Sequence, residues 1–291
     1  MTKAPISILD PLAAALARKS LAGAAGRIRG RAIAAGDGWY ANDFICTCGP
    51  GDHDTEERSS TSGVALLLSG SFIAHDRHGT SLLSEGSLFL VEAGHCFVCS
   101  HRHGEGDRCL SFQFEPELFG RIAHEAGAAP VLARNSLPRL RELSRLAARA
   151  RLALARPEAM EEVAFELAGA AMRLAGRPRR ARAPAHHHGR MTEVLRYMAE
   201  HAAAPHKLTG LARMARMSPY HFLRSFKATT GVTPHQWLLR ARLHRAAARL
   251  ATTRAPVTDI ALEVGFEDLS NFTRTFHAEF GAAPRQYRLA A

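Results

Sequence analysis

The sequence predicts an α+β protein in which strands come first and helices follow. Between about residues 30 and 114, short apolar runs such as 64–73 and 87–91 alternate with glycines, which is typical of a small barrel or sandwich. From Pro116 onward, apolar residues recur at helical spacing. About the last hundred residues contain one helical pattern twice. A chain of 291 residues is long enough to bury two separate cores.

The first unit is expected to span residues 1–115 and to carry the strands. Further short apolar runs lie at 82–83, 96–99 and 109–114. The turns between the runs are marked by Gly70, Gly79, Gly86, Gly94, Gly104 and Gly106.

Residues 116–176 are expected to form a helical extension of two or three helices. A helical spacing of leucines is seen at Leu137, Leu140, Leu143 and Leu146, and the segment 160–174 repeats it. Residues 177–190 are basic and rich in proline without apolar periodicity, which predicts a flexible linker. Three consecutive histidines, 186–188, are expected to be part of a solvated linker, with adventitious metal binding as the alternative.

Residues 191–291 contain an internal repeat with an offset of 50 residues. The offset is constant over seven matched pairs, so the duplication is real. These pairs are Phe222 and Phe272, Arg224 and Arg274, Phe226 and Phe276, Gly231 and Gly281, Pro234 and Pro284, Gln236 and Gln286, and Trp237 and Tyr287.

Each copy has the sequence features of a helix-turn-helix unit. Ser218 and Asp268 are good N-caps for the second helices, which are expected at 218–230 and 268–280. The phenylalanines of each copy lie four residues apart and face a core, and a glycine ends each helix. Shorter first helices are expected at 208–215 and 257–264, and residues 233–252 are expected to form one connecting helix.

The opposite face of each second helix is expected to be exposed and to read DNA. An arginine there can donate two hydrogen bonds to guanine O6 and N7. The rigid connecting helix would place both second helices in successive major grooves, about 34 Å apart. The residues expected on these faces are Tyr220, His221, Leu223 and Arg224 in the first copy, with Lys227 near a phosphate, and Leu269, Ser270, Asn271 and Arg274 in the second.

The charge of the chain favours a polyanionic partner. The formal net charge is +11 and the pI is near 10.2, which suits nucleic acid or an acidic membrane surface. Residues 190–291 contain 15 Lys and Arg against 7 Asp and Glu. No apolar run reaches the roughly 18–20 residues of a membrane span. Charge alone does not choose between these two partners, but the helix-turn-helix repeat makes double-stranded DNA the expected partner, and no membrane partner is expected.

The N-terminus and the cysteines favour a cytoplasmic protein. The apolar stretch near the start is interrupted by Asp10, Pro11, Arg18 and Lys19, which does not suit a signal peptide. The five cysteines, an odd number, argue against a disulfide framework.

The repeat resembles the DNA-binding part of the AraC/XylS family. The segments MSPYHFLRSFKATTGVTPHQWLLRARLHRA and IALEVGFEDLSNFTRTFHAEFGAAPRQYR resemble the two units of that family, and the resemblance covers about residues 190–291. It implies seven helices on promoter DNA, with RNA polymerase as a further partner. The chain departs from the family pattern at Arg216, where glycine is common, and at Leu223 and Leu269, which are apolar and would touch thymine methyls. By position, the resemblance assigns base reading to Tyr220, Leu223, Arg224, Leu269, Ser270, Asn271 and Arg274.

The first unit resembles the cupin-like sensor domains attached to many such regulators. The segments 67–72 and 84–90 are similar to a strand and a turn of a cupin barrel. This resemblance implies a pocket for an effector, either a small molecule or a metal. It also implies that the helices between 137 and 174 serve in a homodimer.

A group of cysteines and histidines near residue 100 is the second candidate site. If Cys99, His101 and His103 lie on one strand they share a face, and Cys109 begins the next strand. Thiolates with imidazoles suit Zn²⁺ or a similar transition metal. Cys46, Cys48 and His53 would approach from an earlier strand. Three interpretations stay open: a metal or redox site, buried structural residues, and contact with an organic effector.

The sequence therefore predicts a ligand- or stress-responsive transcription regulator that is not an enzyme. The alternative is a metal-dependent cupin enzyme with an accessory nucleic-acid-binding tail, which would require three or four metal ligands with an open position. A purely architectural DNA-binding protein would not need the β domain. The sequence contains no paired-carboxylate site and no glycine-rich phosphate loop.

Overall fold

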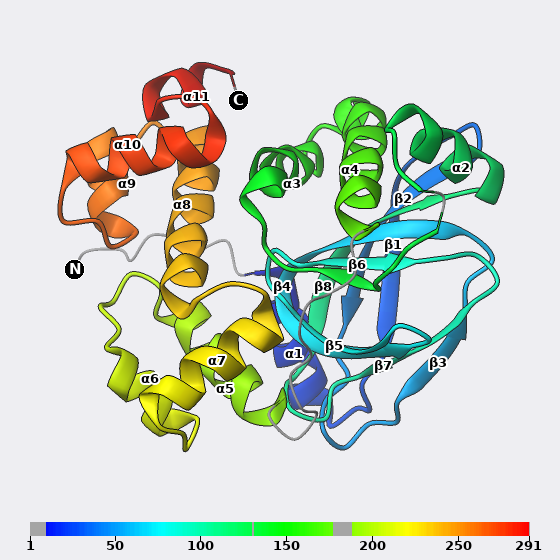
Figure 1. Cartoon of the computed structure of the whole chain (residues 1–291), viewed down its shortest axis with the longest axis horizontal. Helices are drawn as coiled ribbons and strands as arrows, with labels where there is room; N and C mark the ends of the chain where they lie inside the picture. Colours follow the sequence, from blue (N-terminus) through cyan, green and yellow to red (C-terminus); the bar gives the residue numbers. More distant parts are fainter. Residues whose placement is uncertain (1–9, 130, 177–187, 291) are drawn as a thin grey trace.

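The structure is a computed structural model that describes residues 10–129, 131–176 and 188–290. A sheet-rich N-terminal part packs beside a helical C-terminal part (Figure 1).

The strands are β1 (Ile28–Gly36), β2 (Trp39–Cys46), β3 (Thr55–Arg58), β4 (Ser62–Asp76), β5 (Gly79–Ser84), β6 (Leu88–Val91), β7 (Cys96–Ser100), β8 (Asp107–Phe114) and β9 (Ser136–Leu137). The helices of the N-terminal part are α1 (Pro11–Ala22), α2 (Pro116–Glu125), α3 (Arg141–Ala153), the short η1 (Pro157–Ala159) and α4 (Met160–Ala175). The C-terminal part contains α5 (His188–Glu200), α6 (Leu208–Met214), α7 (Pro219–Thr230), α8 (Pro234–Thr252), α9 (Val257–Glu263), α10 (Leu269–Phe280) and α11 (Pro284–Ala290).

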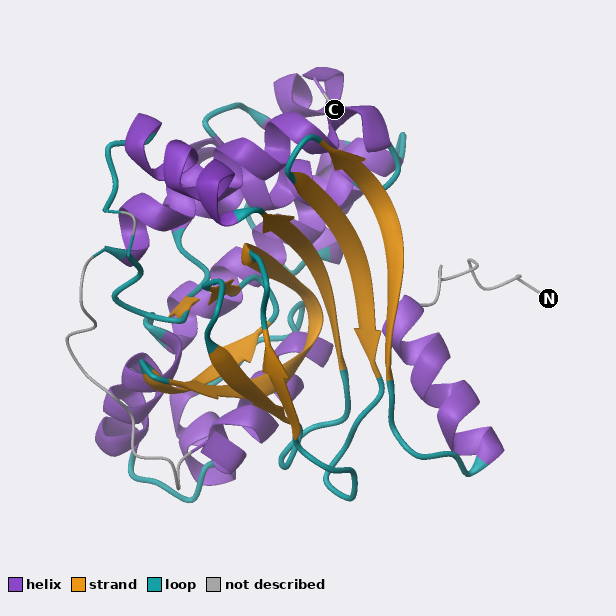
Figure 2. Ribbon diagram, turned by 90° about the vertical axis from the view of Figure 1, so that its right-hand side faces the viewer, coloured by secondary structure: helices purple, strands orange, loops and turns teal. Residues whose placement is uncertain are grey.

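Strand β4 organises the antiparallel sheet. Its first half pairs with β8 and β6, and its second half pairs with β5 and β7. The pairing with β8 shifts register between Leu67 and Ser69, and Gly70 follows with a φ of +78°. A Cβ at Gly70 would lie 2.3 Å from the carbonyl oxygen of Gly106, so this position requires glycine. The bend separates two groups of strands that lie at an angle to each other (Figure 2).

The sheet is buried on both faces, which explains the continuous apolar run in β4. One face packs against α2, α3 and α4 through residues that include Phe114, Phe119 and Leu167. The other face forms a smaller core around Phe72, Leu83 and Phe89. A strand with both faces covered is expected to be apolar throughout rather than alternating.

Two sequence-based predictions in this part are wrong. Leu137 was expected in a helix, but it pairs with Leu88 in the sheet, because Pro138 disfavours helical geometry in the residue before it. Strand β7 ends at Ser100, and Gly104 N donates to His101 O in a turn, so His101 and His103 do not continue the strand face of Cys99. The expected linker lies outside the described residues up to 187, and α5 begins at His188.

The seven helices of residues 188–290 match the number that the resemblance implied. The Ser218 side chain caps α7 at His221 N, and the Asp268 side chain caps α10 at Ser270 N. Gly231 and Gly281 end these helices with φ values of +78° and +73°. None of the helices in the described part of the chain has the length and apolar character of a membrane span.

The C-terminal part has two cores, and each also contains one residue of the N-terminal part. Phe222, Phe226 and Trp237 share a core with Leu82 of β5. Phe272 and its neighbours share a core with Ala148 of α3. Helix α8 runs through both cores, so the two helix-turn-helix units are joined by one helix and both rest on the N-terminal part (Figure 1).

Candidate nucleic-acid interface

Helix α7 buries one face and exposes the other. Phe222 and Phe226 lie four residues apart, so they share one face of the helix. Both are fully buried in the core that also contains Trp237. Tyr220 is 70% exposed, and the guanidinium of Arg224 lies 5.9 Å from the centre of its ring. This contact pre-orients Arg224 along the exposed face. Of the other residues predicted on this face, Leu223 is half-buried, and the exposed ones are His221 and Lys227.

Helix α10 repeats this arrangement 50 residues later. Phe272 and Phe276 are fully buried, whereas Leu269, Ser270, Asn271 and Arg274 are exposed. Arg274 Nη2 donates to Asn271 Oδ1 at 3.2 Å, so the arginine is held over the first turn of its helix. An open depression on this surface is lined by Leu269, Ser270, Thr273, Arg274, His277 and Ala283.

Thr273 and His277 are candidate contact residues that the sequence analysis missed. They follow Leu269 at steps of four, so all three lie along one stripe of α10. That spacing is the signal that could have identified them.

The turn of each unit contains one residue with a positive φ. Arg216 has a φ of +53° in the first unit, and Gly265 has a φ of +94° in the second. Arg216 departs from the family pattern, but it still adopts the left-handed backbone conformation of the turn. A residue with a side chain adopts this conformation at the cost of some backbone strain. At Gly265 a Cβ would lie 2.3 Å from the carbonyl oxygen of Ala203, so glycine is required there.

Arg242 of α8 fixes the relative position of the two units and was not identified from the sequence. Its Nε donates to Ala202 O at 2.7 Å, in the segment after α5. Its Nη1 donates to Gly265 O at 2.8 Å, in the turn of the second unit. Burial lowers the pKa of Arg242. Arg242 is a positioning residue, because it ties one unit to the turn of the other through backbone carbonyls.

Arg139, which is held by a buried ion pair within the N-terminal part, also contacts the C-terminal part. Arg139 is buried, and its Nη2 lies 3.0 Å from Glu85 Oε1. Its guanidinium carbon lies 5.4 Å from the centre of the Trp237 ring, and its carbonyl oxygen accepts a hydrogen bond from Arg240 Nη1 at 2.7 Å. Nearby, Ser144 of α3 donates to Glu279 of α10. The segment that precedes α3 therefore contacts α8, and α3 itself contacts α10.

The cysteine and histidine residues predicted as a metal site do not all come together. His103 lies in the loop after β7 against Gly189, whereas His101 is buried and its Nε2 lies 2.7 Å from Asp107 Oδ1. Cys109 Sγ donates to Asp107 Oδ2 at 2.9 Å. Burial raises the pKa of the Cys99 and Cys109 thiols well above the usual range. In the described residues, the donors that converge are Cys46, His101 and Asp107.

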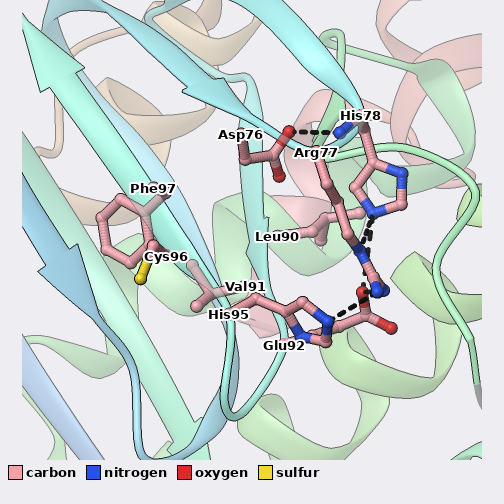
Figure 3. Close-up of a pocket in the computed structure, with 9 residues that line it drawn as sticks. All are labelled: Asp76, Arg77, His78, Leu90, Val91, Glu92, His95, Cys96 and Phe97. Atoms are coloured by element: carbon pink, nitrogen blue, oxygen red, sulfur yellow. Dashed lines mark hydrogen bonds and ion pairs between the residues drawn. The ribbon is translucent and has the colours of Figure 1, made fainter.

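A small surface pocket lies where β4 turns into β5 (Figure 3). Its cavity volume of about 10 Å³ is far below the range of roughly 300–1,000 Å³ found for ligand pockets. Arg77 forms an ion pair with Glu92, and Arg77 Nη1 lies 2.6 Å from His95 Nε2. These polar groups satisfy one another, so the pocket offers little to an organic effector.

Comparisons with known proteins find helix-turn-helix regulators. The family described as "Helix-turn-helix domain" matches residues 211–290. HTH-type transcriptional activator RhaS of Shigella boydii is 35% identical over 99 residues, which are 34% of this chain and 36% of that protein. Regulatory protein SoxS of Salmonella typhimurium is 30% identical over 95 residues, which are 33% of this chain and 89% of that protein. A solved regulator from Chromobacterium violaceum with an AraC-type DNA-binding domain is 27% identical, with a TM-score of 0.34, over 36% of this chain and 95% of that one.

The paired units define a protein with two helix-turn-helix units, and its relatives support a DNA-binding transcription regulator. The similarity to SoxS covers most of that relative. The chain belongs to the AraC/XylS family. It spans 36–40% of the length of the first curated relatives that it matches, RhaS and the probable transcriptional regulator LumQ of Photobacterium leiognathi.

Proposed function

We propose that the protein is a ligand- or stress-responsive transcription regulator that binds promoter DNA through α7 and α10 in successive major grooves. The equivalent placement of Arg224 and Arg274 carries this proposal. Both are exposed on the second helix of a unit whose opposite face is buried. RhaS is described as a transcriptional activator, which supports a regulatory role. We place this role in the cytoplasm, with RNA polymerase as a further partner.

The exposed residues would divide into base-reading and phosphate-binding groups. The arginines would read guanine, and Leu269, which is 43% exposed, would contact a thymine methyl. Lys227 in the last turn of α7 would bind a phosphate. The remaining base-reading residues would be Tyr220, His221, Leu223, Ser270 and Asn271.

The N-terminal part would serve as the effector domain. Residues 1–115 would form a cupin-like sensor, and residues 116–176 would contribute to a homodimer. Because α3 packs against α8 and α10, such a dimer would use the outer surfaces of α2 and α4. The DNA-binding domain proposed at 191–291 would follow this part, although its first helix α5 already begins at His188.

The proposal is tested by selecting binding sites with the full-length protein from a random pool of double-stranded DNA. We expect a bipartite site with its halves about one helical turn apart, because a monomer already presents two reading helices. Genome-wide mapping would then show whether these sites lie in promoters. Recovery of sites with a single recognised half would contradict the two-groove arrangement.

Replacing Arg224 or Arg274 by alanine should weaken binding to the selected site by about 1–3 kcal/mol each. Each change should also relax base preference in one half of the site, because each arginine reads one groove. Arg121→Ala is the matched control, since it removes an exposed arginine from α2 and leaves both reading helices intact. Titrations against the selected site and against single-base variants measure both effects. Equal losses on every sequence would show that these arginines do not read bases.

Replacing Lys227 by alanine should weaken binding without changing sequence preference. A phosphate contact releases condensed counterions, so its loss should reduce the slope of log K against log salt by about one unit. The measurement is a series of binding titrations at several salt concentrations. An unchanged slope would place Lys227 away from the phosphate backbone.

A further inference from the structure

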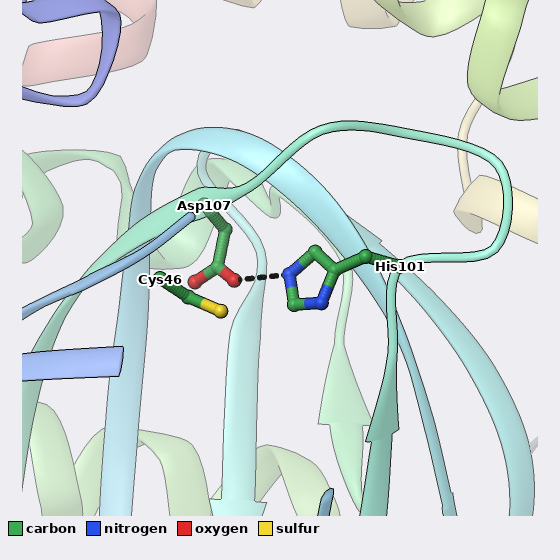
Figure 4. Close-up of side chains that lie close together, drawn as sticks. All are labelled: Cys46, His101 and Asp107. Carbon is green, nitrogen blue, oxygen red and sulfur yellow. Dashed lines mark hydrogen bonds and ion pairs between the residues drawn. The ribbon is translucent and has the colours of Figure 1, made fainter. Parts of the chain in front are cut away.

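Cys46, His101 and Asp107 come from three different segments and meet at one end of the barrel (Figure 4). Cys46 is the last residue of β2, and it pairs directly with Asp107, the first residue of β8. His101 follows the last residue of β7. One potential ligand atom from each side chain lies within 4.8 Å of the other two, and all three residues are buried.

The chemistry of this group points to a metal rather than to packing alone. A buried carboxylate is costly unless it is paired, and Asp107 is held here by His101 and by the Cys109 thiol. A thiol, an imidazole and a carboxylate together are the ligand types that proteins use for Zn²⁺. Three protein ligands leave a fourth position of a tetrahedral ion for a solvent molecule or an effector.

We propose that Cys46, His101 and Asp107 form a site for a borderline transition-metal ion such as Zn²⁺, and that occupancy of this site regulates DNA binding. This set differs from the one expected from the sequence, since it replaces Cys99, His103 and Cys109 by Cys46 and Asp107. Cys109 remains a partner of Asp107 outside the ligand set. The regulatory half of the proposal rests on the proposed function as a DNA-binding regulator.

The loop from His101 to Gly106 connects the metal site to the DNA-binding part. His101 lies at the start of this loop, and Asp107 follows its end. At its tip, a Cβ added to Gly189 would lie 2.9 Å from His103 Nδ1, so the imidazole rests on the first turn of α5. A Cβ added to Gly104 would lie 3.4 Å from the Thr192 methyl, also on α5. Binding of the ion would replace the hydrogen bond between His101 and Asp107 and so shift the loop. Because the loop contacts α5, this shift would displace α5 as well.

The first test measures metal binding directly. Full-length protein carrying His186→Gln and His187→Gln, which reduces binding by the histidine tract, is titrated with Co²⁺ and followed by the absorption of thiolate-bound Co²⁺. We expect one Co²⁺ per chain, with displacement by Zn²⁺. Cys46→Ser should abolish the thiolate signal, and His101→Gln and Asp107→Asn should weaken binding by more than about tenfold, since even partners of metal ligands contribute that much. Cys96→Ser, which changes an exposed thiol, should bind as the parent does.

Circular dichroism melts of each variant identify those that retain the fold. Folded variants at Cys46, His101 and Asp107 that bind Co²⁺ as tightly as the parent would overturn the site. If Cys46→Ser does not fold, the other two substitutions and the spectrum of the parent decide the question. A parent spectrum without thiolate ligation would also overturn it.

The second test measures DNA affinity with and without Zn²⁺, using a DNA site selected with the parent protein. We expect at least a fivefold change in affinity for the parent and none for Asp107→Asn. Gly189→Ala, which alters the contact between His103 and α5, should keep Co²⁺ binding and lose the change in DNA affinity. An affinity that Zn²⁺ does not alter in the parent would overturn the regulatory half. Failure of the metal-free parent to bind any DNA would instead contradict the proposed function, and the Co²⁺ titration would still decide the site.

Discussion

Replacing Glu85 by glutamine is expected to lower the free energy of unfolding by about 3 kcal/mol, because the buried Arg139 would lose the carboxylate that compensates its charge. Arg151 Nη2 also lies 3.5 Å from Glu85 Oε1, so one carboxylate serves two guanidinium groups. The substitution keeps the volume of the side chain and removes only its charge. The loss should be read from denaturant unfolding followed by the fluorescence of Trp237, which lies against Arg139.

The matched control is Glu162→Gln. Glu162 pairs with Arg149 at 2.9 Å, but its side chain is 69% exposed. An exposed ion pair contributes at most about 1 kcal/mol, so this variant should unfold almost as the parent does. Equal losses in the two variants would show that burial gives the pairing of Glu85 with Arg139 no added contribution to stability.

The same ion pair predicts a loss of stability in acid. Burial raises the pKa of Glu85, but the charges of Arg139, Arg151 and Arg245 outweigh it and hold the pKa below the ordinary value of 4.5. A carboxyl group with a lowered pKa stabilises the fold fully above its unfolded value. That stabilisation is lost as the pH falls through the folded pKa, below about 4.5. The Glu85→Gln variant should lose less stability over this interval than the parent.

Replacing Phe276 by alanine is expected to cost about 3–5 kcal/mol, since the side chain is fully buried and the surrounding rings cannot close the cavity. The ring centre of Phe276 lies 5.5 Å from that of Phe272, 4.6 Å from that of Phe280 and 5.3 Å from that of Tyr287. The second helix-turn-helix unit depends on this aromatic cluster, because α9 and α11 are only 7 residues long each. Calorimetry and unfolding titrations measure the loss.

Leu269→Ala on the same helix provides the contrast. Leu269 is 43% exposed and lies on the face that we propose reads DNA, so its truncation should change stability by less than about 0.5 kcal/mol. It should instead alter binding to the selected DNA site. If Leu269→Ala destabilised the protein as much as Phe276→Ala, the assignment of the two faces of α10 would be wrong.

The C-terminal part could be predicted closely because its determinants are local. The capping residues, the phenylalanine pairs and the terminal glycines each act within a few residues, so the repeat at Phe222 and Phe272 identifies both units. The conformation of Arg216 is an exception, because its positive φ depends on the turn as a whole.

The N-terminal site could be predicted only in part because it depends on contacts between distant residues. His101 was identified because cysteines and histidines cluster near it in the sequence. Its partners Cys46 and Asp107 are brought together by the register of β2 against β8, which the sequence does not reveal. Asp107 was passed over because a single carboxylate at the start of a strand has no periodic signature. Glu85 and Arg139 lie 54 residues apart in the sequence and meet only through the fold.

Leu82 packs in the core of one helix-turn-helix unit, and Ala148 packs in the core of the other. These contacts leave α7 and α10 little freedom to change their relative angle around the axis of a bound duplex. One inserted base pair between two half-sites rotates the second half by about 35° around the duplex axis. To follow that rotation, α10 would have to move relative to α7 against a common support as well as against the connecting helix. Half-site spacing in the operator should therefore be as strict a requirement as the bases themselves.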